Sequence, residues 1–276
     1  MVDVERLKVA GCSTENLDGQ VERNLKNIEK WVKVSVNKGA ELVCFSELSV
    51  CGYWMSSDIW SVAERIPGAV TNRLIEIART HRVYITAGMA EKEDNIVYNT
   101  QVLVGPKGLT GKQRKLHIGP GEFKYYKGGN KFSVFDIGKC KIGISICYDN
   151  LLPEDSRILA LMGAEVLIMP WCCAPSTTRE WHNCFYMTCA QARAADNGLW
   201  VVGVNAAGCN NYYPGHAWVL EPHGGRIVAE TKGKGNGEKM VMAELYPEPV
   251  IEKRQAENSV FKIRRPEIYG KLVERR

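Results

Sequence analysis

The stretch "KIGISICYDNLLPEDSRILALMGAEVLIMP", residues 141–170, predicts a strand, a helix and a second strand in direct succession. An apolar run ends at Cys147, and a helix is expected to begin with Pro153 and Glu154, which are favoured in a first turn. Gly163 is typical of a helix end, and the segment "EVLIMP" that follows has the composition of a buried strand. This succession is typical of α/β proteins, in which helices cover the faces of a sheet.

The same alternation continues on both sides of this stretch, together with hairpins, so the chain is predicted to be an α/β domain with mixed sheets. No linker of Pro, Gly and Ser interrupts this alternation, so residues 1–276 are expected to form a single domain. Residues 247–276 are rich in Glu, Lys and Arg and are not core-like, so they are expected to form an arm or a solvated tail. Residues 131–147 are expected to form a hairpin of strands turned at Gly138. The other expected strands are 7–11, 41–45, 82–91, 95–106, 199–205, 216–222, 225–230 and 239–245, and the other expected helices are 21–39, 69–80 and 177–198.

Composition and charge exclude several classes of protein. The net charge of +5 is mild and the basic residues are dispersed among acidic ones, which predicts no nucleic-acid partner. The N-terminal segment lacks the apolar region of a signal peptide and no run of about 18 apolar residues occurs, so a soluble, cytoplasmic protein with no membrane partner is expected. The ten cysteines and five histidines lack C-x-x-C and H-x-x-x-H spacing, which predicts reduced thiols and neither a metal nor a cofactor.

Three residues that follow predicted strands are candidates for chemistry. Cys147 precedes a helix start, where the helix dipole would favour a thiolate, although most cysteines are core residues. Glu47 is flanked by apolar and aromatic residues, and burial there would raise its pKa towards that of a general base. Lys115 on its own would be an ordinary surface lysine, but α/β proteins build their sites at strand ends, where all three residues are predicted to lie.

The segments "FSELSVCGY", "RKLHIGPGE" and "ISICYDNLLPE", which carry these residues, resemble the three signature segments of the nitrilase superfamily of carbon-nitrogen hydrolases. They occur in the same order and at similar separations, and the resemblance covers nearly the whole chain. It implies a four-layer α-β-β-α sandwich with two mixed sheets. It also implies a homodimer or a larger homo-oligomer, formed through the helices that follow Cys147 and Thr177. In such an assembly, residues 247–276 are expected to form an arm that contacts a partner subunit.

The resemblance implies a mechanism as well. Cys147 attacks the carbonyl or nitrile carbon, Glu47 removes its proton, and Lys115 with the backbone N–H of Tyr148 stabilises the oxyanion. Ammonia or an amine leaves, and water hydrolyses the thioester. Many family members have a second glutamate after the lysine, and Glu122 matches it by location, either as a catalytic residue or as one that positions substrate.

The resemblance narrows the substrate class only in part. Relatives that hydrolyse N-carbamoyl amino acids often have an arginine just after the aspartate of the nucleophile segment, where this chain has Asn150 and Leu151. A small amide or N-carbamoyl amine is therefore the leading expectation. Hydrolysis of nitriles, a non-catalytic binding or scaffold protein, and a thiol redox sensor that uses Cys172 and Cys173 are the alternatives.

Other residues near these segments have expected roles. Tyr148 and Trp171 are candidates for substrate contact, since binding pockets are mostly apolar with few polar groups. Asp149 is expected to be a local cap or a buried hydrogen-bond acceptor, and Glu154 a first-turn charge. Arg193 is a candidate cation for both carboxylates. The other aromatic residues near the segments are Tyr53, Trp54, Tyr125 and Tyr126.

Overall fold

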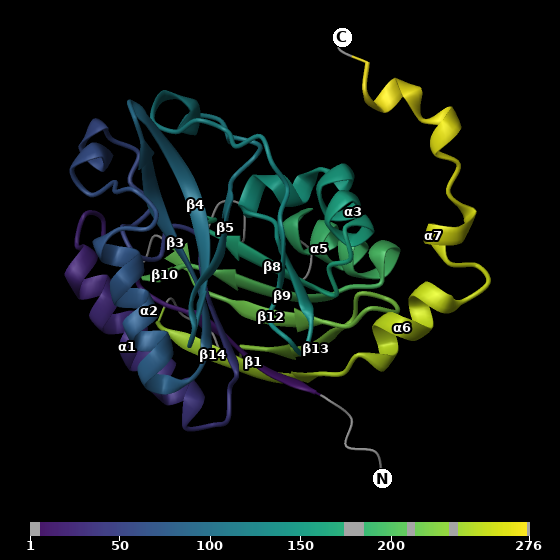
Figure 1. The fold of residues 1–276 in the computed structure, drawn as a ribbon, viewed down its shortest axis with the longest axis horizontal. Helices are drawn as coiled ribbons and strands as arrows, with labels where there is room; N and C mark the ends of the chain where they lie inside the picture. Colours follow the sequence, from purple (N-terminus) through teal and green to yellow (C-terminus); the bar gives the residue numbers. More distant parts are fainter. Residues whose placement is uncertain (1–5, 174–184, 209–212, 232–236, 275–276) are drawn as a thin grey trace.

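A computed structural model describes residues 6–173, 185–208, 213–231 and 237–274 of the chain. It contains two six-stranded mixed sheets that pack face to face, with helices on the two outer faces (Figure 1). The predicted four-layer α-β-β-α sandwich is therefore confirmed.

The first sheet has the order β14-β1-β2-β3-β4-β5, and its three central strands β1, β2 and β3 are parallel. The other three strands are joined to it in antiparallel pairs. Its strands are β1 (Leu7–Ser13), β2 (Leu42–Phe45), β3 (Tyr84–Glu93), β4 (Ile96–Gly105), β5 (Gly108–Arg114) and β14 (Lys239–Leu245).

The second sheet repeats this plan with the order β13-β12-β9-β8-β7-β6, in which β7, β8 and β9 are parallel. A separate short pair, β10 (Ala207–Gly208) and β11 (Tyr213–Pro214), lies outside both sheets. The strands of the second sheet are β6 (Val134–Asp136), β7 (Lys141–Ile144), β8 (Val166–Trp171), β9 (Trp200–Asn205), β12 (Ala217–Leu220) and β13 (Ile227–Glu230).

Burial on both faces explains why the central strands are continuously apolar. In β2, Leu42 and Cys44 pack between the two sheets, whereas Val43 and Phe45 pack under the helices α1 (Val21–Val36) and α2 (Ala69–His81). Successive side chains of a strand point to opposite faces, so a strand covered on both faces needs apolar residues at every position. The helices α3 (Pro153–Leu161) and α5 (Phe185–Asn197) cover the second sheet (Figure 1).

The helix ends agree in part with the sequence predictions. Pro153 occupies the first turn of α3, and Gly163, just beyond its end, has a positive φ of 95°, as expected. The first helix ends at Val36, before the predicted Gly39. The predicted start of α5 at Thr177 lies outside the described residues.

The C-terminal segment leaves β14 of the first sheet as α6 (Glu248–Gln255) and then runs away from the body of the molecule through α7 (Val260–Ile263), as the yellow ribbon of Figure 1 shows. The short 3₁₀ helices η5 (Pro266–Ile268) and η6 (Gly270–Leu272) follow. Among the described residues, no helix is long and apolar enough to cross a membrane.

Candidate active site

The three signature segments come from both sheets and meet at one site. Glu47 lies in the turn after β2, and Lys115 directly follows β5 of the same sheet. Cys147 opens the 3₁₀ helix η3 (Cys147–Leu151) after β7 of the other sheet. The Glu47 and Lys115 side chains are in contact, and both interact electrostatically with the Cys147 thiol.

The ammonium of Lys115 lies between two buried carboxylates. Its Nζ is 2.8 Å from Oε1 of Glu47, 2.9 Å from Oε1 of Glu122 and 2.8 Å from Oε2 of Glu122. Glu122, in the 3₁₀ helix η2 (Glu122–Lys124), also accepts a bond of 2.5 Å from the backbone N–H of Gly119. The side-chain amide of Asn99, in β4, donates to Oε1 of Glu47 at 2.7 Å. These contacts fix the ammonium between Glu47 and Glu122.

Burial and charge set the protonation of this group. Burial raises the pKa of Glu47, and the negative charge of Glu122 adds to the rise, although the attraction of Lys115 opposes it. Burial would discharge Lys115, but the charges of Glu47 and Glu122 and the hydrogen bond with Glu122 hold its pKa well above the usual value. The second oxygen of Glu47, Oε2, is buried and has no hydrogen-bond partner among the described residues. The raised pKa predicted for Glu47 is confirmed, and this carboxylate can accept a proton.

The Cys147 thiol is protonated in the resting site, contrary to the sequence prediction. A hydrogen bond with Cys173, burial and the charge of Glu47 raise the pKa of Cys147 well above its usual value, against the opposing effect of Lys115. The expected helix dipole is weak here because α3 begins only at Pro153, after the short helix η3. The thiol therefore needs a base to become a nucleophile.

The backbone at Cys147 is strained. Its φ of 46° lies in the left-handed region, which costs a residue with a Cβ roughly 1–2 kcal/mol. The turn is held by Asn150, whose side-chain amide donates to the carbonyls of Ser145 at 3.0 Å and of Cys147 at 3.1 Å. Arg193 donates to the backbone carbonyls of Asn150 and Leu151, at 3.3 and 3.1 Å. The proposed pairing of Arg193 with the carboxylates of Asp149 and Glu154 is therefore wrong, since the guanidinium caps the end of this turn.

The two aromatic candidates lie in different environments. Tyr148 is half-buried, next to Cys147 and close to Gly119. Trp171 has no exposed surface and packs edge-on against Tyr186, with ring centroids 4.9 Å apart. The position of Trp171 favours packing, whereas Tyr148 remains a candidate for substrate contact.

Two further residues, Tyr53 and Asn99, lie next to these groups. Burial raises the pKa of the Tyr53 phenol, and the negative charges of Glu47 and Glu122 raise it further, so this ring lies near the two carboxylates. Asn99 was not among the sequence candidates, because an asparagine within a strand carries no signal of its own. Only its contact with Glu47 in the folded chain identifies it.

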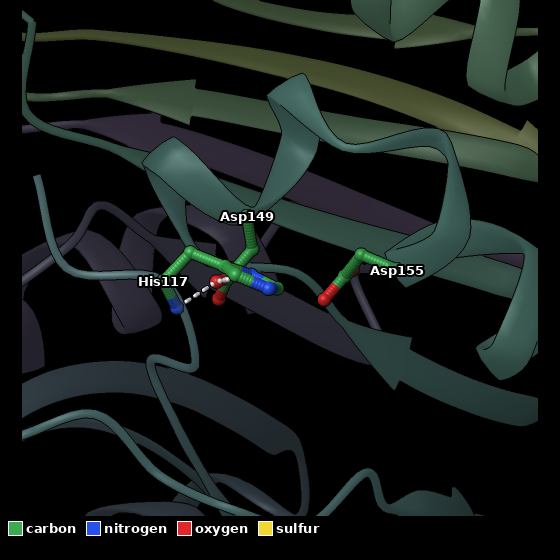
Figure 2. Close-up of side chains that lie close together, drawn as sticks. All are labelled: His117, Asp149 and Asp155. Carbon is green, nitrogen blue, oxygen red and sulfur yellow. Dashed lines mark hydrogen bonds and ion pairs between the residues drawn. The ribbon is translucent and has the colours of Figure 1, made fainter. Parts of the chain in front are cut away.

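A further cluster lies beside the nucleophile turn. His117, Asp149 and Asp155 offer ligand atoms within 4.8 Å of one another, a spacing that could suit a metal ion (Figure 2). The oxygens of Asp149 already accept hydrogen bonds from three backbone N–H groups and from the His117 ring. The acceptor oxygens of Asp149 are thus occupied by hydrogen bonds within the protein, and its predicted role as a buried acceptor is confirmed.

Comparisons with known proteins agree with this geometry. The profile of the family described as "Carbon-nitrogen hydrolase" matches residues 8–255. A nitrilase of Pyrococcus abyssi is 34% identical over 259 residues, covering 90% of this chain and 93% of its own. An omega-amidase of Xenopus tropicalis is 30% identical, covering 90% and 91%. The crystal structure of a carbon-nitrogen hydrolase from Helicobacter pylori G27 superposes with a TM-score of 0.88 at 21% identity, covering 98% and 99%.

Proposed function

Because this chain belongs to the carbon-nitrogen hydrolase family, we propose that it hydrolyses the carbon–nitrogen bond of a small amide or N-carbamoyl amine through a cysteine thioester. The observation that carries the proposal is the buried ammonium of Lys115 held between Glu47 and Glu122 beside the Cys147 thiol. A buried acid, cation and thiol have no packing purpose that apolar residues would not serve better. This grouping supports chemistry over a scaffold role.

In the first step, Glu47 accepts the proton of the Cys147 thiol while the sulfur attacks the carbonyl carbon. The C=O electron pair moves onto oxygen, and the Lys115 ammonium and the Tyr148 backbone N–H stabilise the resulting oxyanion. The unpartnered Oε2 of Glu47 is suited to this transfer, since Oε1 is held by Lys115 and Asn99. Charges preorganised in a buried site act on the transition state without reorganisation.

In the second step, the tetrahedral intermediate collapses and the carbon–nitrogen bond breaks. The leaving nitrogen takes the proton from Glu47 and departs as ammonia or an amine, which leaves the acyl group on Cys147. Water then attacks the thioester, Glu47 accepts a proton from it, and the sulfur leaves as the carboxylic product forms. The proton on Glu47 returns to the thiolate, which restores the resting thiol.

The nucleophile turn supports an uncharged substrate. Asn150 is fully buried and its amide is bonded to the backbone, so it offers no cation to a substrate carboxylate. Leu151, which follows it, is apolar. Relatives of this chain include an omega-amidase and an (R)-stereoselective amidase, both of which act on amides by name. Nitrile hydrolysis is the second candidate, because the relative from Pyrococcus abyssi is described as a nitrilase.

We propose further that residues 1–276 form one hydrolase domain and that 247–276 contact a partner subunit in a homodimer or larger assembly. The first part of this segment packs on the body, since Val250 is buried and Phe261 lies under the guanidinium groups of Arg157 and Arg254. The last part exposes apolar side chains, with Leu272 64% and Val273 85% exposed. A second copy of the chain would cover them.

The function is tested by ammonia release from a panel of amides, N-carbamoyl amines and nitriles. Cys147→Ala should abolish release, by roughly a thousandfold or more, with an unchanged circular dichroism spectrum. Cys140→Ala, which removes a half-buried thiol remote from the site, is the matched control. Intact mass spectrometry of the wild type should detect an acyl adduct that Cys147→Ala lacks. Undiminished turnover by Cys147→Ala would disprove the nucleophile, and a wild type inactive on the whole panel would favour the non-catalytic alternative.

A further inference from the structure

The carboxylate of Asp149 binds the segment that carries Lys115. Its Oδ1 accepts hydrogen bonds from the backbone N–H of Leu116 at 3.1 Å and from that of His117 at 2.6 Å. Both donors immediately follow Lys115 in the sequence, just beyond β5 of the first sheet. Asp149 is 1% exposed, so water competes little for these bonds. The lysine segment is therefore attached to a side chain of the nucleophile turn.

The other oxygen of the same carboxylate binds the turn itself. Oδ2 of Asp149 accepts from the backbone N–H of Ile146 at 3.2 Å, and the Asp149 N–H donates to the Ile146 carbonyl at 3.0 Å. Ile146 directly precedes Cys147. Besides the bond that caps this turn, Asp149 therefore also bonds the segment that carries Lys115. The single carboxylate of Asp149 therefore connects the segment after β5 of the first sheet with the turn after β7 of the second sheet.

Two titratable side chains, His117 and Asp155, lie beside Asp149. The ring Nδ1 of His117 lies 2.8 Å from Oδ1 (Figure 2), and this bond raises the pKa of His117 although burial opposes the rise. Asp155 and Glu154 add to the rise through their charges. On the other side, burial and the charge of Asp149 raise the pKa of Asp155 to about 8, against the effects of Ser145, His117 and Arg193. Near neutral pH, Asp155 is therefore mostly protonated.

We propose that Asp149 is a positioning residue that sets the Lys115 ammonium against the oxyanion formed at Cys147. It touches neither substrate nor the reacting atoms. The inference rests on the proposed function, since it assumes that Cys147 is the nucleophile and Lys115 the oxyanion donor. A misplacement of about 1 Å at a reacting centre can cost roughly a hundredfold in rate. Lys115 would be displaced in this way if the backbone after it were released.

The test uses the full-length Asp149→Asn variant. Asparagine keeps the size of the side chain but replaces one acceptor oxygen with an NH₂ group, which repels the backbone N–H donors on that side. Turnover of the best amide of the panel should fall by about a hundredfold in kcat, with KM changed by less than about threefold. Asp155→Asn is the matched control, because no described backbone N–H of either segment donates to Asp155. Its kcat should stay within about twofold of wild type.

A second measurement separates positioning from general loosening of the site. Iodoacetamide alkylates the Cys147 sulfur by displacement of iodide, a reaction that needs the thiol and its base but forms no oxyanion. In Asp149→Asn, the alkylation rate should stay within about threefold of wild type while turnover falls about a hundredfold. Asp155→Asn should change neither rate.

Two outcomes would overturn the inference. Wild-type turnover by Asp149→Asn would show that the bonds from Asp149 to the lysine segment are not needed for catalysis. Equal losses of turnover and alkylation would show a merely structural role. If Asp149→Asn fails to fold, Asp149→Ser takes its place, because its shorter side chain cannot bond both the turn and the lysine segment, and the same fall in turnover with an unchanged alkylation rate is expected. Failure of the proposed function is seen separately, as turnover retained by Cys147→Ala.

Discussion

The Nζ atom of Lys115 lies 2.8 Å from Oε1 of Glu47, and both side chains are buried. Two buried charges are stable only when each is paired and hydrogen-bonded, a condition that Asn99 and Glu122 help to meet. With two carboxylates and one ammonium, the group is one positive charge short of neutrality. It therefore binds a proton readily, which matches the raised pKa of Glu47.

Lys115→Met should impair both catalysis and stability. The change removes the proposed oxyanion donor, so kcat should fall about a hundredfold or more. It also leaves Glu47 and Glu122 buried without a cation, so the free energy of unfolding in urea at neutral pH should fall by roughly 3–5 kcal/mol. Lys112→Met is the control, since Glu91 would keep its pairing with Arg114. Wild-type stability of Lys115→Met would show that the two carboxylates do not need the ammonium.

The two glutamates should differ in their effect on the rate. Glu47→Gln removes the base and should lower kcat by about 10²–10⁴-fold. Glu122→Gln keeps most of the packing and should lower kcat much less, because Glu122 holds Lys115 and exchanges no proton. Steady-state kinetics on the same amide measure both variants. A loss in Glu122→Gln as large as that in Glu47→Gln would assign a proton-transfer role to Glu122.

The pH profile should report the raised pKa of Glu47. The base must be ionised to accept the thiol proton, so kcat/KM should fall as pH decreases through this pKa, with an acid limb above the usual value of 4.5. Burial and the charge of Glu122 cause the rise. Glu122→Gln should therefore move the acid limb to lower pH. An unmoved or upward-moved limb would contradict the assignment.

The central strands and the triad were predictable because each has a local signal. Glu47 and Cys147 lie at the ends of apolar runs, and Lys115 precedes the apolar and Gly/Pro-rich stretch "LHIGPG". The periodicity of α2 and the first turn of α3 are explicit in the sequence. The edge strand β5, "GLTGKQR", was not predicted, since it is half-exposed and contains two glycines and three long polar residues. Edge strands lack the apolar pattern of strands buried on both faces.

Contacts between distant segments were beyond sequence reasoning. Asn99 reaches Glu47 only because β4 lies beside β3 in the first sheet. The role of Asp149 as an acceptor was predictable, but two of its donors come from the segment of Lys115. The raised pKa of Cys147 depends on Cys173, which follows another strand. Each of these relations is created by the packing of two sheets, not by neighbours in the chain.

The C-terminal arm should control assembly. Val273→Asp places a charge on an apolar side chain that is 85% exposed in the single chain, so its folding should not change. If a partner subunit covers this side chain, the charge should raise the dissociation constant of the oligomer by about tenfold or more. Sedimentation velocity across a concentration series measures it. Val34→Asp on α1 is the control, and identical sedimentation of both variants and wild type would exclude Val273 from the interface.

Asp155 should make the protein less stable as pH rises towards 8. The pKa of this buried carboxyl is about 8 in the folded chain, whereas in the unfolded chain it takes the usual value near 4. Below both values the group is protonated in both states, so the stability it contributes is fully present. As pH rises, the unfolded state ionises first, and that contribution is lost progressively until the folded carboxyl also ionises near pH 8.

Asparagine does not titrate, so the stability of Asp155→Asn relative to wild type should increase by a few kcal/mol between pH 5 and pH 8. Urea unfolding at both pH values measures this difference, with the exposed Asp94→Asn as the control. If the difference in unfolding free energy between wild type and Asp155→Asn does not change with pH, Asp155 is ionised in the folded protein. The neighbouring Asp149 would then need a second cation beside His117.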